Sequence, residues 1–382
     1  MRSVRAALQL IPKTLKDKLK KNERLTGLYV RSVRKSGLFF DAPSPKQTQA
    51  LYNHWLEVNE SAFSNSITNI GEWQAVVFGI DNQGVTEENI KTLGVKTCLI
   101  TGELALGAIE KKISLLDDRL PTLLLNGGDL LESSAIYHLL KALKDNDLVY
   151  CDTDELSSNG TKTSPRFLPS WNPELQYSTG YINSGVIVKT SRLKSLHISN
   201  QTTIAEVIAE LSLSINDLMV NHMPLPLVHL SVTENNEAKL LERVKMVIER
   251  HSTATVELDE KFHVNRLCWP NTNPLVSLII PTKNGKALVK ACIESILEKT
   301  AYLNYEILLI DNGSDEKESI EYFSYLDTLE KVRVLQYPAP FNYSAINNFG
   351  VEHAKGSILG LVNNDIEVIS PDWLTYMVGH VE

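Results

Sequence analysis

The fold of this chain is decided by the stretch Val276-Ser277-Leu278-Ile279-Ile280-Pro281-Thr282-Lys283-Asn284, which is followed by Glu306-Ile307-Leu308-Leu309-Ile310-Asp311-Asn312-Gly313-Ser314. Each part is a short apolar run that ends in polar turn residues, which is typical of a buried parallel strand. Between them, Ala287 to Glu298 places its apolar side chains at helical spacing. Strand, helix and strand make a βαβ unit, and ligands of such sheets bind beyond the carboxyl ends of the strands.

Polar residues follow the strands of this predicted sheet. Asp311 ends the second run, and Asn363-Asn364-Asp365 follows a third run, Leu359 to Val362. A nucleoside diphosphate is bound with a divalent cation, which takes carboxylate oxygens from the protein and the rest from phosphate and water. Asp365 is therefore a candidate ligand of Mg²⁺ or Mn²⁺, and Asp311 could accept the imide N–H of a pyrimidine. On the residues alone the alternative stays open, since an Asp after a strand often only shapes a turn or caps a helix.

The earlier part of the chain repeats the α/β pattern. The sequence predicts a helix over Gln47 to Glu60 and a helix over Glu237 to His251. The domains expected are a basic N-terminal helical segment (1–70), an α/β domain (71–235), a helix and linker (236–273) and a second α/β domain (274–382). Short apolar runs predict strands in the first α/β domain, at Gln74 to Ile80, Thr97 to Ile100, Pro121 to Leu125, Asp147 to Cys151 and Ser184 to Lys189.

A faint internal repeat links the two α/β domains. Leu123 to Ser133 resembles Leu359 to Ser370: each has an apolar strand, an Asn-containing polar tract ending in Asp, further apolar residues and a Ser. The match is short, so it suggests a duplication and no more.

Bulk composition excludes several classes of protein. Of the 382 residues 43% are hydrophobic and 22% charged, as in an ordinary globular protein, and the formal net charge of −8 argues against a general nucleic-acid binder. The four cysteines form no CxxC pair, so buried free thiols in a reducing cytoplasm are expected rather than disulfides or a zinc site. No apolar run is long enough to span a membrane, and the N-terminus shows no secretory signal.

Positive charge is concentrated at the N-terminus. Residues 1–35 hold 11 lysine and arginine residues against Asp17 and Glu23, beside a rough apolar stripe that Pro12 breaks. Two interpretations stay open. The segment is either an interfacial helix held to anionic lipid on the inner face of the cytoplasmic membrane, or a solvated leader that packs on the protein.

The stretch from Val276 to Trp373 resembles the first half of the catalytic domain of family-two glycosyltransferases with the GT-A fold. It is most similar to bacterial two-domain transferases of the rhamnosyltransferase type, which build surface polysaccharides. The matching motifs occur in family order: Ser277 to Gly285, Ser295 to Leu297 with Thr300 and Tyr302, Ile310 to Ser314, Pro340 to Asn348, Val362 to Ile369, and Pro371 to Leu374.

This resemblance implies two GT-A/Rossmann-like α/β/α domains with mostly parallel sheets, the first degenerate and the second incomplete. It implies roles for the matching residues: Pro281, Thr282, Asn284, Asp311, Asn347, Asn363 and Asn364 would bind the nucleotide sugar, and Asp365 would bind the metal. Asn363 stands where the family usually has the first Asp of its Asp-x-Asp motif, which leaves one carboxylate in place of two.

Residues 121–230 resemble the end of the N-terminal domain of the same two-domain proteins. Where that family has an acidic metal triplet, this chain has Asn126-Gly127-Gly128-Asp129, so we expect a degenerate domain that binds no nucleotide sugar. Asp152-Thr153-Asp154 is a literal Asp-x-Asp after a strand. We interpret it as a solvated acidic turn, because by the resemblance it lies after the nucleotide-binding half.

Three hypotheses follow from these observations. In the first, the protein transfers a sugar from a nucleotide-diphosphate donor to a saccharide or lipid-linked saccharide acceptor, with inversion. No residue matches the family's general base, so this chain would supply the donor half of the site and look truncated. The second is a non-catalytic nucleotide-binding or scaffold protein that partners another transferase. The third, a nucleotidyltransferase, is disfavoured because no Gly-rich phosphate loop follows a strand.

Overall fold

We analysed a computed structural model of the chain, which describes residues 45–63, 71–103, 108–157, 159–198, 202–231 and 237–382. The chain divides into two compact units. The first is formed from residues 1–172, 181–211 and 217–235, and the second from 173–180, 212–216 and 236–382. The basic segment 1–35, and with it the predicted contact with lipid, lies outside the described residues. No helix in the described ranges is long and apolar enough to cross a membrane.

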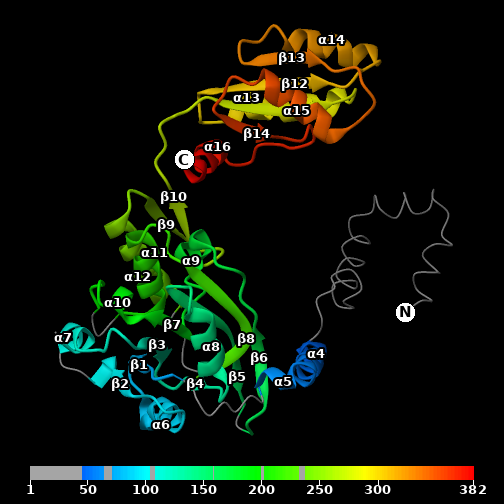
Figure 1. The fold of residues 1–382 in the computed structure, drawn as a ribbon. Coiled ribbons are helices and arrows are strands. Elements are labelled where there is room, and N and C mark those ends of the chain that lie inside the picture. Colours follow the sequence, from blue (N-terminus) through cyan, green and yellow to red (C-terminus); the bar gives the residue numbers. More distant parts are fainter. Residues whose placement is uncertain (1–44, 64–70, 104–107, 158, 199–201, 232–236) are drawn as a thin grey trace, which may run out of the picture. The chain divides into compact units, whose positions relative to one another are not determined.

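The first unit is built on an eight-stranded sheet with the order β2-β1-β3-β7-β5-β8-β4, and β6 pairs with β5 (Figure 1). The pairings make β1, β2, β3, β5 and β8 run in one direction, while β4, β6 and β7 run in the other. Its strands are β1 (Gln74–Phe78), β2 (Thr97–Ile100), β3 (Pro121–Asn126), β4 (Leu130–Leu131), β5 (Leu148–Leu156), β6 (Lys162–Arg166), β7 (Val186–Lys189) and β8 (Val220–Leu230).

Helices accompany these strands. They are α4 (Pro45–Val58), α5 (Glu60–Phe63), α6 (Val85–Thr92), α7 (Ala108–Ser114), α8 (Ala135–Leu143), α10 (Thr190–Leu193) and α11 (Ile204–Ser214), with 3₁₀ turns at Asn82–Gly84 and Thr101–Glu103. The core forms where α8 lays Ile136 and Leu139 against Leu123, Leu125 and Val149 of the sheet. These side chains are fully buried, as expected for apolar runs covered by a helix.

The second unit contains a four-stranded sheet with the order β13-β12-β11-β14, in which every pair is parallel. Its strands are β11 (Val276–Thr282), β12 (Tyr305–Asp311), β13 (Val332–Gln336) and β14 (Ile358–Leu361). Its helices are α9 (Pro173–Thr179), α12 (Glu237–His251), α13 (Lys286–Lys299), α14 (Lys317–Leu326), α15 (Tyr343–His353) and α16 (Trp373–Val381). The stretch expected to connect the domains holds a hairpin, β9 (Thr255–Asp259) and β10 (Val264–Cys268).

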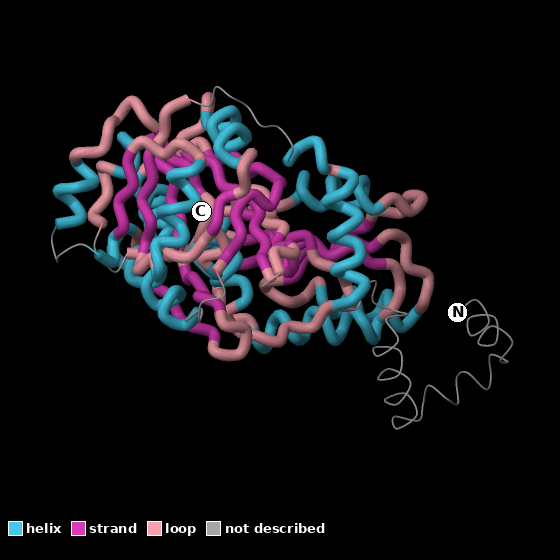
Figure 2. Tube along the Cα trace, turned by 90° about the horizontal axis from the view of Figure 1, so that it is seen from below, coloured by secondary structure: helices cyan, strands magenta, loops and turns pink. Residues whose placement is uncertain are grey.

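Helices cover both faces of this parallel sheet. On one face α13 and α14 pack Ile293 and Phe323 into a core with Leu278 and Ile307. On the other face α15 packs Ile346 against Ile279, Leu308 and Ile310. A Cβ atom at Gly350 of α15 would lie 2.5 Å from Ile279, so this glycine lets the helix approach the sheet closely. Figure 2 shows the strands of the molecule in magenta between the helices in cyan. The predicted α/β class is confirmed.

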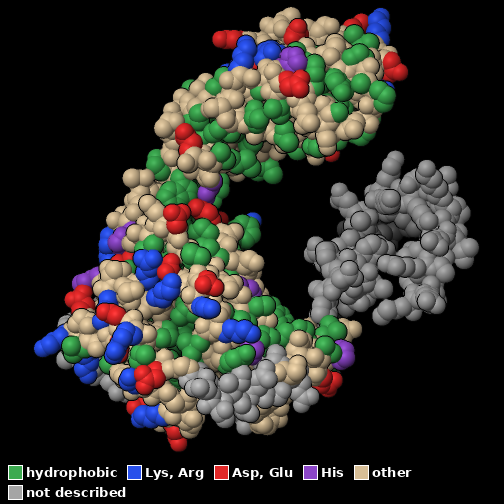
Figure 3. All heavy atoms as spheres, in the orientation of Figure 1, with side chains coloured by type: hydrophobic (Ala, Val, Ile, Leu, Met, Phe, Trp, Pro, Cys, Tyr) green, Lys and Arg blue, Asp and Glu red, His purple; other side chains and the backbone are tan. Residues whose placement is uncertain are grey.

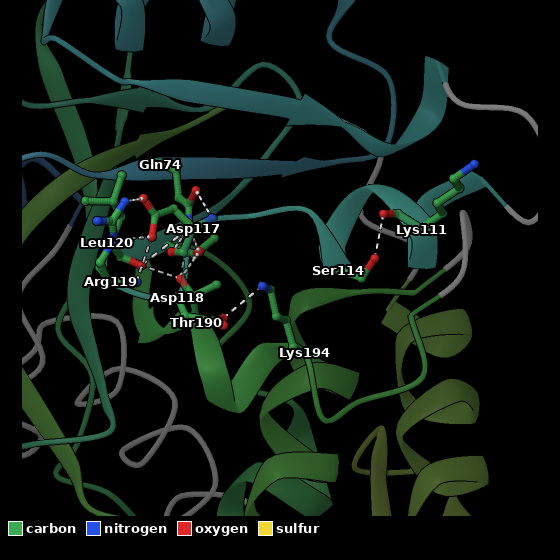
Figure 4. A network of polar contacts seen from close by, with 10 residues as sticks. Gln74, Lys111, Ser114, Asp117, Asp118, Arg119, Leu120, Thr190 and Lys194 are labelled. Atoms are coloured by element: carbon green, nitrogen blue, oxygen red, sulfur yellow. Dashed lines mark hydrogen bonds and ion pairs between the residues drawn. The ribbon is translucent and has the colours of Figure 1, made fainter.

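A polar network lies at the amino ends of strands β1 and β3 of the first unit (Figure 4). The Gln74 amide group donates to the carbonyl of Asp117 at 2.9 Å and to the Thr190 hydroxyl at 3.0 Å, and Asp117 also binds the guanidinium of Arg119 at 2.8 Å. Lys194 pairs with Asp118 at 2.8 Å. Since ligands of parallel sheets bind at the carboxyl ends, this network is best understood as a structural tie between the two strands and α10.

Candidate functional site

A cleft of about 230 Å³ opens at the carboxyl ends of the parallel strands of the second unit. Thr282 at the end of β11 pairs with Asp311 at the end of β12, and Leu361 at the end of β14 pairs with Ile279. The three strand ends therefore meet at one edge of the sheet. The cleft is lined by Pro281, Thr282, Lys283, Asn312, Phe341, Tyr343, Ile346, Asn363 and Asn364.

Four of the predicted site residues line this cleft, namely Pro281, Thr282, Asn363 and Asn364. Asn284, Asp311, Asn347 and Asp365 lie next to lining residues in the sequence but are not among them. A cleft of this volume is below the roughly 300–1,000 Å³ of pockets that enclose a small molecule, so it would hold part of a nucleotide sugar.

Asp311 is buried, with 3% of its surface exposed, and shapes the turn after β12. Its Oδ1 accepts hydrogen bonds from the backbone N–H of Ser314 at 2.9 Å and from the Ser314 hydroxyl at 2.6 Å. No described residue donates to its Oδ2. The next residue, Asn312, donates from its amide to the carbonyls of Tyr337 and Ala339 at 2.9 and 2.8 Å, and thereby fixes the loop after β13.

Asn284 joins the loops that follow β11 and β12. Its side-chain oxygen accepts from the backbone N–H groups of Asp315 and Glu316 at 2.9 and 3.0 Å, and its amide donates to the Asp315 carboxylate at 2.7 Å. This hydrogen bond from Asn284 lowers the pKa of Asp315. Asn284 has a φ of 56°, a left-handed conformation that asparagine tolerates better than most residues. The side chain thus positions two loops, and a contact with the nucleotide stays a prediction.

Asn347 is a buried residue of α15, 4% exposed, one position after the cleft residue Ile346. Its amide donates to the carbonyl of Tyr343 at 2.8 Å. Its Oδ1 is buried without a hydrogen-bond partner among the described residues. A buried acceptor without a donor costs about 1–3 kcal/mol, so this atom is a point at which a bound group or a water would stabilise the helix.

Asn363 and Asn364 of the Asn363-Asn364-Asp365 triplet line the cleft, and Asp365 follows them in the sequence. Asn364 donates to the Thr282 hydroxyl at 3.0 Å, and the carbonyl of Asn363 lies 3.6 Å from the thiol of Cys292. Burial raises the pKa of that thiol to about 11, so Cys292 stays neutral and packs as an apolar side chain. Asp365 is exposed, and no described residue forms a hydrogen bond or ion pair with its carboxylate.

The side-chain oxygens of Asn363, Asn364 and Asp365 fit a hard cation only in part. The described residues contain no group of three or more His, Cys, Asp or Glu side chains that could hold a metal ion. Asp365 offers a free carboxylate, and Asn363 and Asn364 beside it carry neutral carbonyl oxygens. This suits a cation such as Mg²⁺, which is usually held by one or two carboxylates together with phosphate and water.

In the first unit, the tract Asn126-Gly127-Gly128-Asp129 corresponds to Asn363-Asn364-Asp365, and its acidic residue is buried. Asp129, 2% exposed, accepts hydrogen bonds from the Ser184 hydroxyl at 2.6 Å and from the backbone N–H groups of Ser231 and Asn126 at 3.0 and 3.1 Å. Burial raises the pKa of this carboxyl group. A Cβ atom at Gly127 would lie 2.1 Å from the carbonyl oxygen of Ile80, so the neighbouring loops are packed against each other here.

The interpretation of Asp152-Thr153-Asp154 as a solvated turn is wrong. Both aspartates lie inside β5, at 1% and 0% exposure. Asp152 accepts from the backbone N–H of Leu168 and bonds His222 Nε2, each at 2.8 Å. Asp154 accepts from the Tyr52 hydroxyl at 2.5 Å and contacts His229 Nδ1.

Further charges complete this buried network. Glu132 binds the Lys162 ammonium group at 2.5 Å and faces His229 Nε2 at 3.3 Å. The signal in the sequence was the alternation of Asp152 and Asp154 on one face of a continuous strand. Their histidine partners lie 70 and 75 residues further on, in β8, so a local reading could not find them.

Sequence reasoning missed Lys283, Asn312, Phe341, Tyr343 and Ile346 as lining residues. Lys283 and Asn312 each follow a strand end directly, which is a signal that could have identified them. The other three come from the loop before α15 and from its first turn, which reach the cleft through the fold of the chain between β13 and β14.

Comparison with known proteins agrees with the resemblance noted for this region. Residues 277–382 match the model of the family described as glycosyl transferase family 2. An uncharacterized protein of Sinorhizobium fredii is 32% identical over 277 residues, which cover 67% of this chain and 30% of that protein. The O-antigen biosynthesis protein RfbC of Myxococcus xanthus is 28% identical over 251 residues, 62% of this chain and 20% of that protein.

The chain therefore spans about a third or less of the length of these two relatives. Among solved structures, a mannosyltransferase from Pyrobaculum calidifontis in complex with GDP-Man and Mn²⁺ matches with 19% identity and a TM-score of 0.26. The match covers 28% of this chain and 32% of that one.

Proposed function

We propose that this protein acts in sugar transfer from a nucleotide-diphosphate donor to a saccharide or lipid-linked acceptor, because residues 277–382 match the family model described as glycosyl transferase family 2. The observation that carries the proposal is the cleft where Thr282, Asn312, Asn363 and Asn364 converge beside the exposed carboxylate of Asp365. The similarity to an O-antigen biosynthesis protein supports a role in bacterial surface polysaccharide synthesis.

The binding role of each residue follows from its chemistry. Asp311 Oδ2, which receives no bond from a described residue, would accept the N–H of a pyrimidine. Lys283 at the rim of the cleft would face the negatively charged phosphates. Asp365, with the amide oxygens of Asn363 and Asn364, would hold Mg²⁺ or Mn²⁺ against the diphosphate. When bound, such a cation offsets the charge that develops on the leaving diphosphate.

The transfer proposed is a displacement with inversion at the anomeric carbon. The acceptor oxygen forms the new bond to that carbon, the bond to the diphosphate breaks, and the acceptor proton passes to a general base. A general base must lie within hydrogen-bond reach of the acceptor hydroxyl. We assign no described residue to this task, so the chain's share of the reaction is the binding and orientation of the donor.

Calorimetric titration of the full chain with UDP- and dTDP-sugars, with and without Mn²⁺, tests the proposal. We expect binding that depends on Mn²⁺ and that falls at least tenfold in Asp365→Ala. The matched control is Glu367→Ala, which removes an exposed carboxylate two residues away that pairs with Lys299 at 3.2 Å. Binding that survives in Asp365→Ala, or that is lost equally in both variants, would contradict the assignment of the metal to Asp365.

A second candidate is a non-catalytic scaffold that partners another transferase. One observation favours it, namely the single carboxylate at a position where two are usual, which weakens the hold on a cation. If no nucleotide sugar binds in the titration, this candidate replaces the first.

The cytoplasmic location proposed for the protein includes peripheral contact with the inner face of the membrane through residues 1–35. The surplus of lysine and arginine there supports it, since each basic residue near an anionic surface adds about 1 kcal/mol. Flotation with vesicles containing 30 mol% phosphatidylserine tests this. The full chain should float at low salt, and a chain beginning at residue 36 should stay in the dense fraction.

A further inference from the structure

The segment 363–369, which carries Asn363, Asn364 and Asp365, is held by one side of α13. These residues form no helix or strand, and within the described chain they take part in no backbone-to-backbone hydrogen bond. Buried backbone groups need partners, so the position of the segment depends on the side chains that bind it and on its packing.

α13 presents side chains to this segment at helical spacing. Cys292, Ser295 and Lys299 stand three and four residues apart, so they lie on one side of the helix. The thiol of Cys292 lies 3.6 Å from the carbonyl of Asn363, and Lys299 donates to the carbonyl of Val368 at 3.1 Å. α13 therefore contacts the segment near both of its ends.

Ser295 makes the central contact of this row. Its hydroxyl oxygen accepts from the backbone N–H of Val368 at 3.0 Å, and its O–H donates to the carbonyl of Cys292 at 2.8 Å. Ser295 and Val368 are each 5% exposed, and Val368 belongs to the apolar core. Without this hydroxyl the Val368 N–H would be buried with no acceptor, which is unfavourable, so the segment would move until the group is hydrated.

The position of Asp365 follows from this hydrogen bond and one other. Toward the sheet, Asn364 donates to the Thr282 hydroxyl at 3.0 Å. Toward α13, Val368 is bound by Ser295. Three residues lie between Asn364 and Val368, and Asp365 is the first of them. So short a stretch has little conformational freedom once both of its ends are fixed, and the exposed carboxylate of Asp365 is held in place through its backbone.

We propose that Ser295 is a positioning residue of the donor site, which acts through Val368 to set where Asp365 and the two asparagines before it stand. Ser295 is not among the residues that line the cleft. Figure 3 shows charged and apolar side chains together on the surface of residues 274–382, and Ser295, at 5% exposure, contributes almost nothing to such a surface. It therefore acts without contacting the ligand. The inference rests on the proposed function, because it assigns Ser295 to the same site.

Hydrogen exchange of the full chain without any ligand, measured by mass spectrometry, tests the first step. In Ser295→Ala the amides of residues 364–369 should exchange roughly fivefold faster or more, while those of β12 keep their rates. The matched control is Ser319→Ala. Ser319 is fully buried in α14 of the same unit and its hydroxyl donates to Glu316 at 3.1 Å, so this variant loses a buried hydroxyl that holds no part of the segment.

Circular dichroism shows whether each variant is folded. If Ser295→Ala does not fold, Ser295→Cys takes its place in both experiments, because the thiol nearly keeps the volume of the side chain and is a weaker acceptor.

Calorimetric titration of the same variants with UDP- and dTDP-sugars in the presence of Mn²⁺ tests the second step. Groups that orient a metal ligand typically change metal affinity by about 10–100-fold when they are replaced. We therefore expect the affinity to fall about tenfold in Ser295→Ala and to stay within about twofold of the wild type in Ser319→Ala.

Faster exchange of the segment together with weaker binding in Ser295→Ala supports the proposal. It is overturned if the exchange is unchanged, if it rises equally in Ser319→Ala, or if the segment loosens while the affinity stays that of the wild type. A wild type that binds no nucleotide sugar would overturn the proposed function instead, and the exchange experiment would still decide whether Ser295 positions the segment.

Discussion

The two units each place an Asn-containing tract after a parallel strand, but they use the acidic residue at its end in different ways. In the first unit, β3 lies between β1 and β7, and Asp129 is buried among donors from Asn126, Ser184 and Ser231. In the second unit, Asp365 follows β14 and is exposed. Similar local sequences thus give a structural carboxylate in one unit and an available one in the other, because the surrounding elements differ.

The largest expected effect is the loss of stability on replacing Asp129, which tests whether the two carboxylates have different roles. Asp129→Ala leaves the Ser184 hydroxyl and two backbone N–H groups buried without an acceptor, which should lower the free energy of unfolding by about 3 kcal/mol. Asp365→Ala removes an exposed group and should change it by less than about 0.5 kcal/mol. Urea denaturation followed by circular dichroism measures both. Equal losses in the two variants would show that the carboxylates do not differ in the way described.

A second prediction concerns the pH dependence of the first unit. Burial acts to lower the pKa of His229, but its hydrogen bonds to Asp154 and Glu132 outweigh burial and raise it. The hydrogen bond from His229 comes first in lowering the pKa of Glu132 to about 2. Lys162 and the Tyr52 hydroxyl also face this network, and Asp152 of the same strand, whose pKa is raised by burial, acts on Tyr52.

The signs follow from these shifts. A raised histidine pKa gives stability that is complete below about pH 6.5 and is lost as the pH rises through the folded value. A lowered glutamate pKa gives stability that is present above about pH 4.5 and is lost as the pH falls toward 2. Hydrogen exchange of β5 and β8 should therefore be slowest between about pH 4.5 and 6.5, after correction for the intrinsic rate.

His229→Gln should remove the decline on the alkaline side and cost about 1–3 kcal/mol below pH 6.5. His353→Gln is the control, since His353 is an exposed residue of the second unit whose ring bonds the Phe349 carbonyl. An unchanged alkaline profile in His229→Gln would assign the pH dependence to another group.

The smallest expected effect is that of replacing Asn364, which tests whether this residue of the second unit binds a ligand or only stabilises the fold. Asn364→Ala removes the hydrogen bond to Thr282 and should cost about 1 kcal/mol of stability. If the two loops form the donor site, the affinity for a nucleotide sugar should fall several-fold, as measured by the same calorimetric titration. Asn348→Ala, an exposed asparagine of α15, is the control. Loss of stability without any loss of affinity would make Asn364 a structural residue like Asp129.

The fold of the second unit was predictable because its signals are local. The apolar runs ending at Thr282 and Asp311 are strands, and the helix between them has its apolar side chains at the spacing expected. The helix predicted over Glu237 to His251 has those bounds in the structure.

The site was predictable in part. Pro281, Thr282, Asn363 and Asn364 could be placed at the cleft because parallel strands bring their carboxyl ends together. Partners distant in sequence could not be found in this way. The burial of Asp152 and Asp154 depends on histidines in β8, and the contact of Asn284 with Asp315 depends on how two loops meet.

The bridge made by Asn284 has a mechanical consequence. Since its amide group holds the loop after β12 and its backbone N–H binds Ser314 at 2.6 Å, the segments after β11 and β12 must shift together or not at all. Phe341, which is 76% exposed, lines the same cleft from the loop between β13 and α15, and Asn312 ties that loop to the end of β12. A molecule entering the cleft would thus meet loops that are joined to one another, and adjustment to its size would fall to the exposed ring of Phe341.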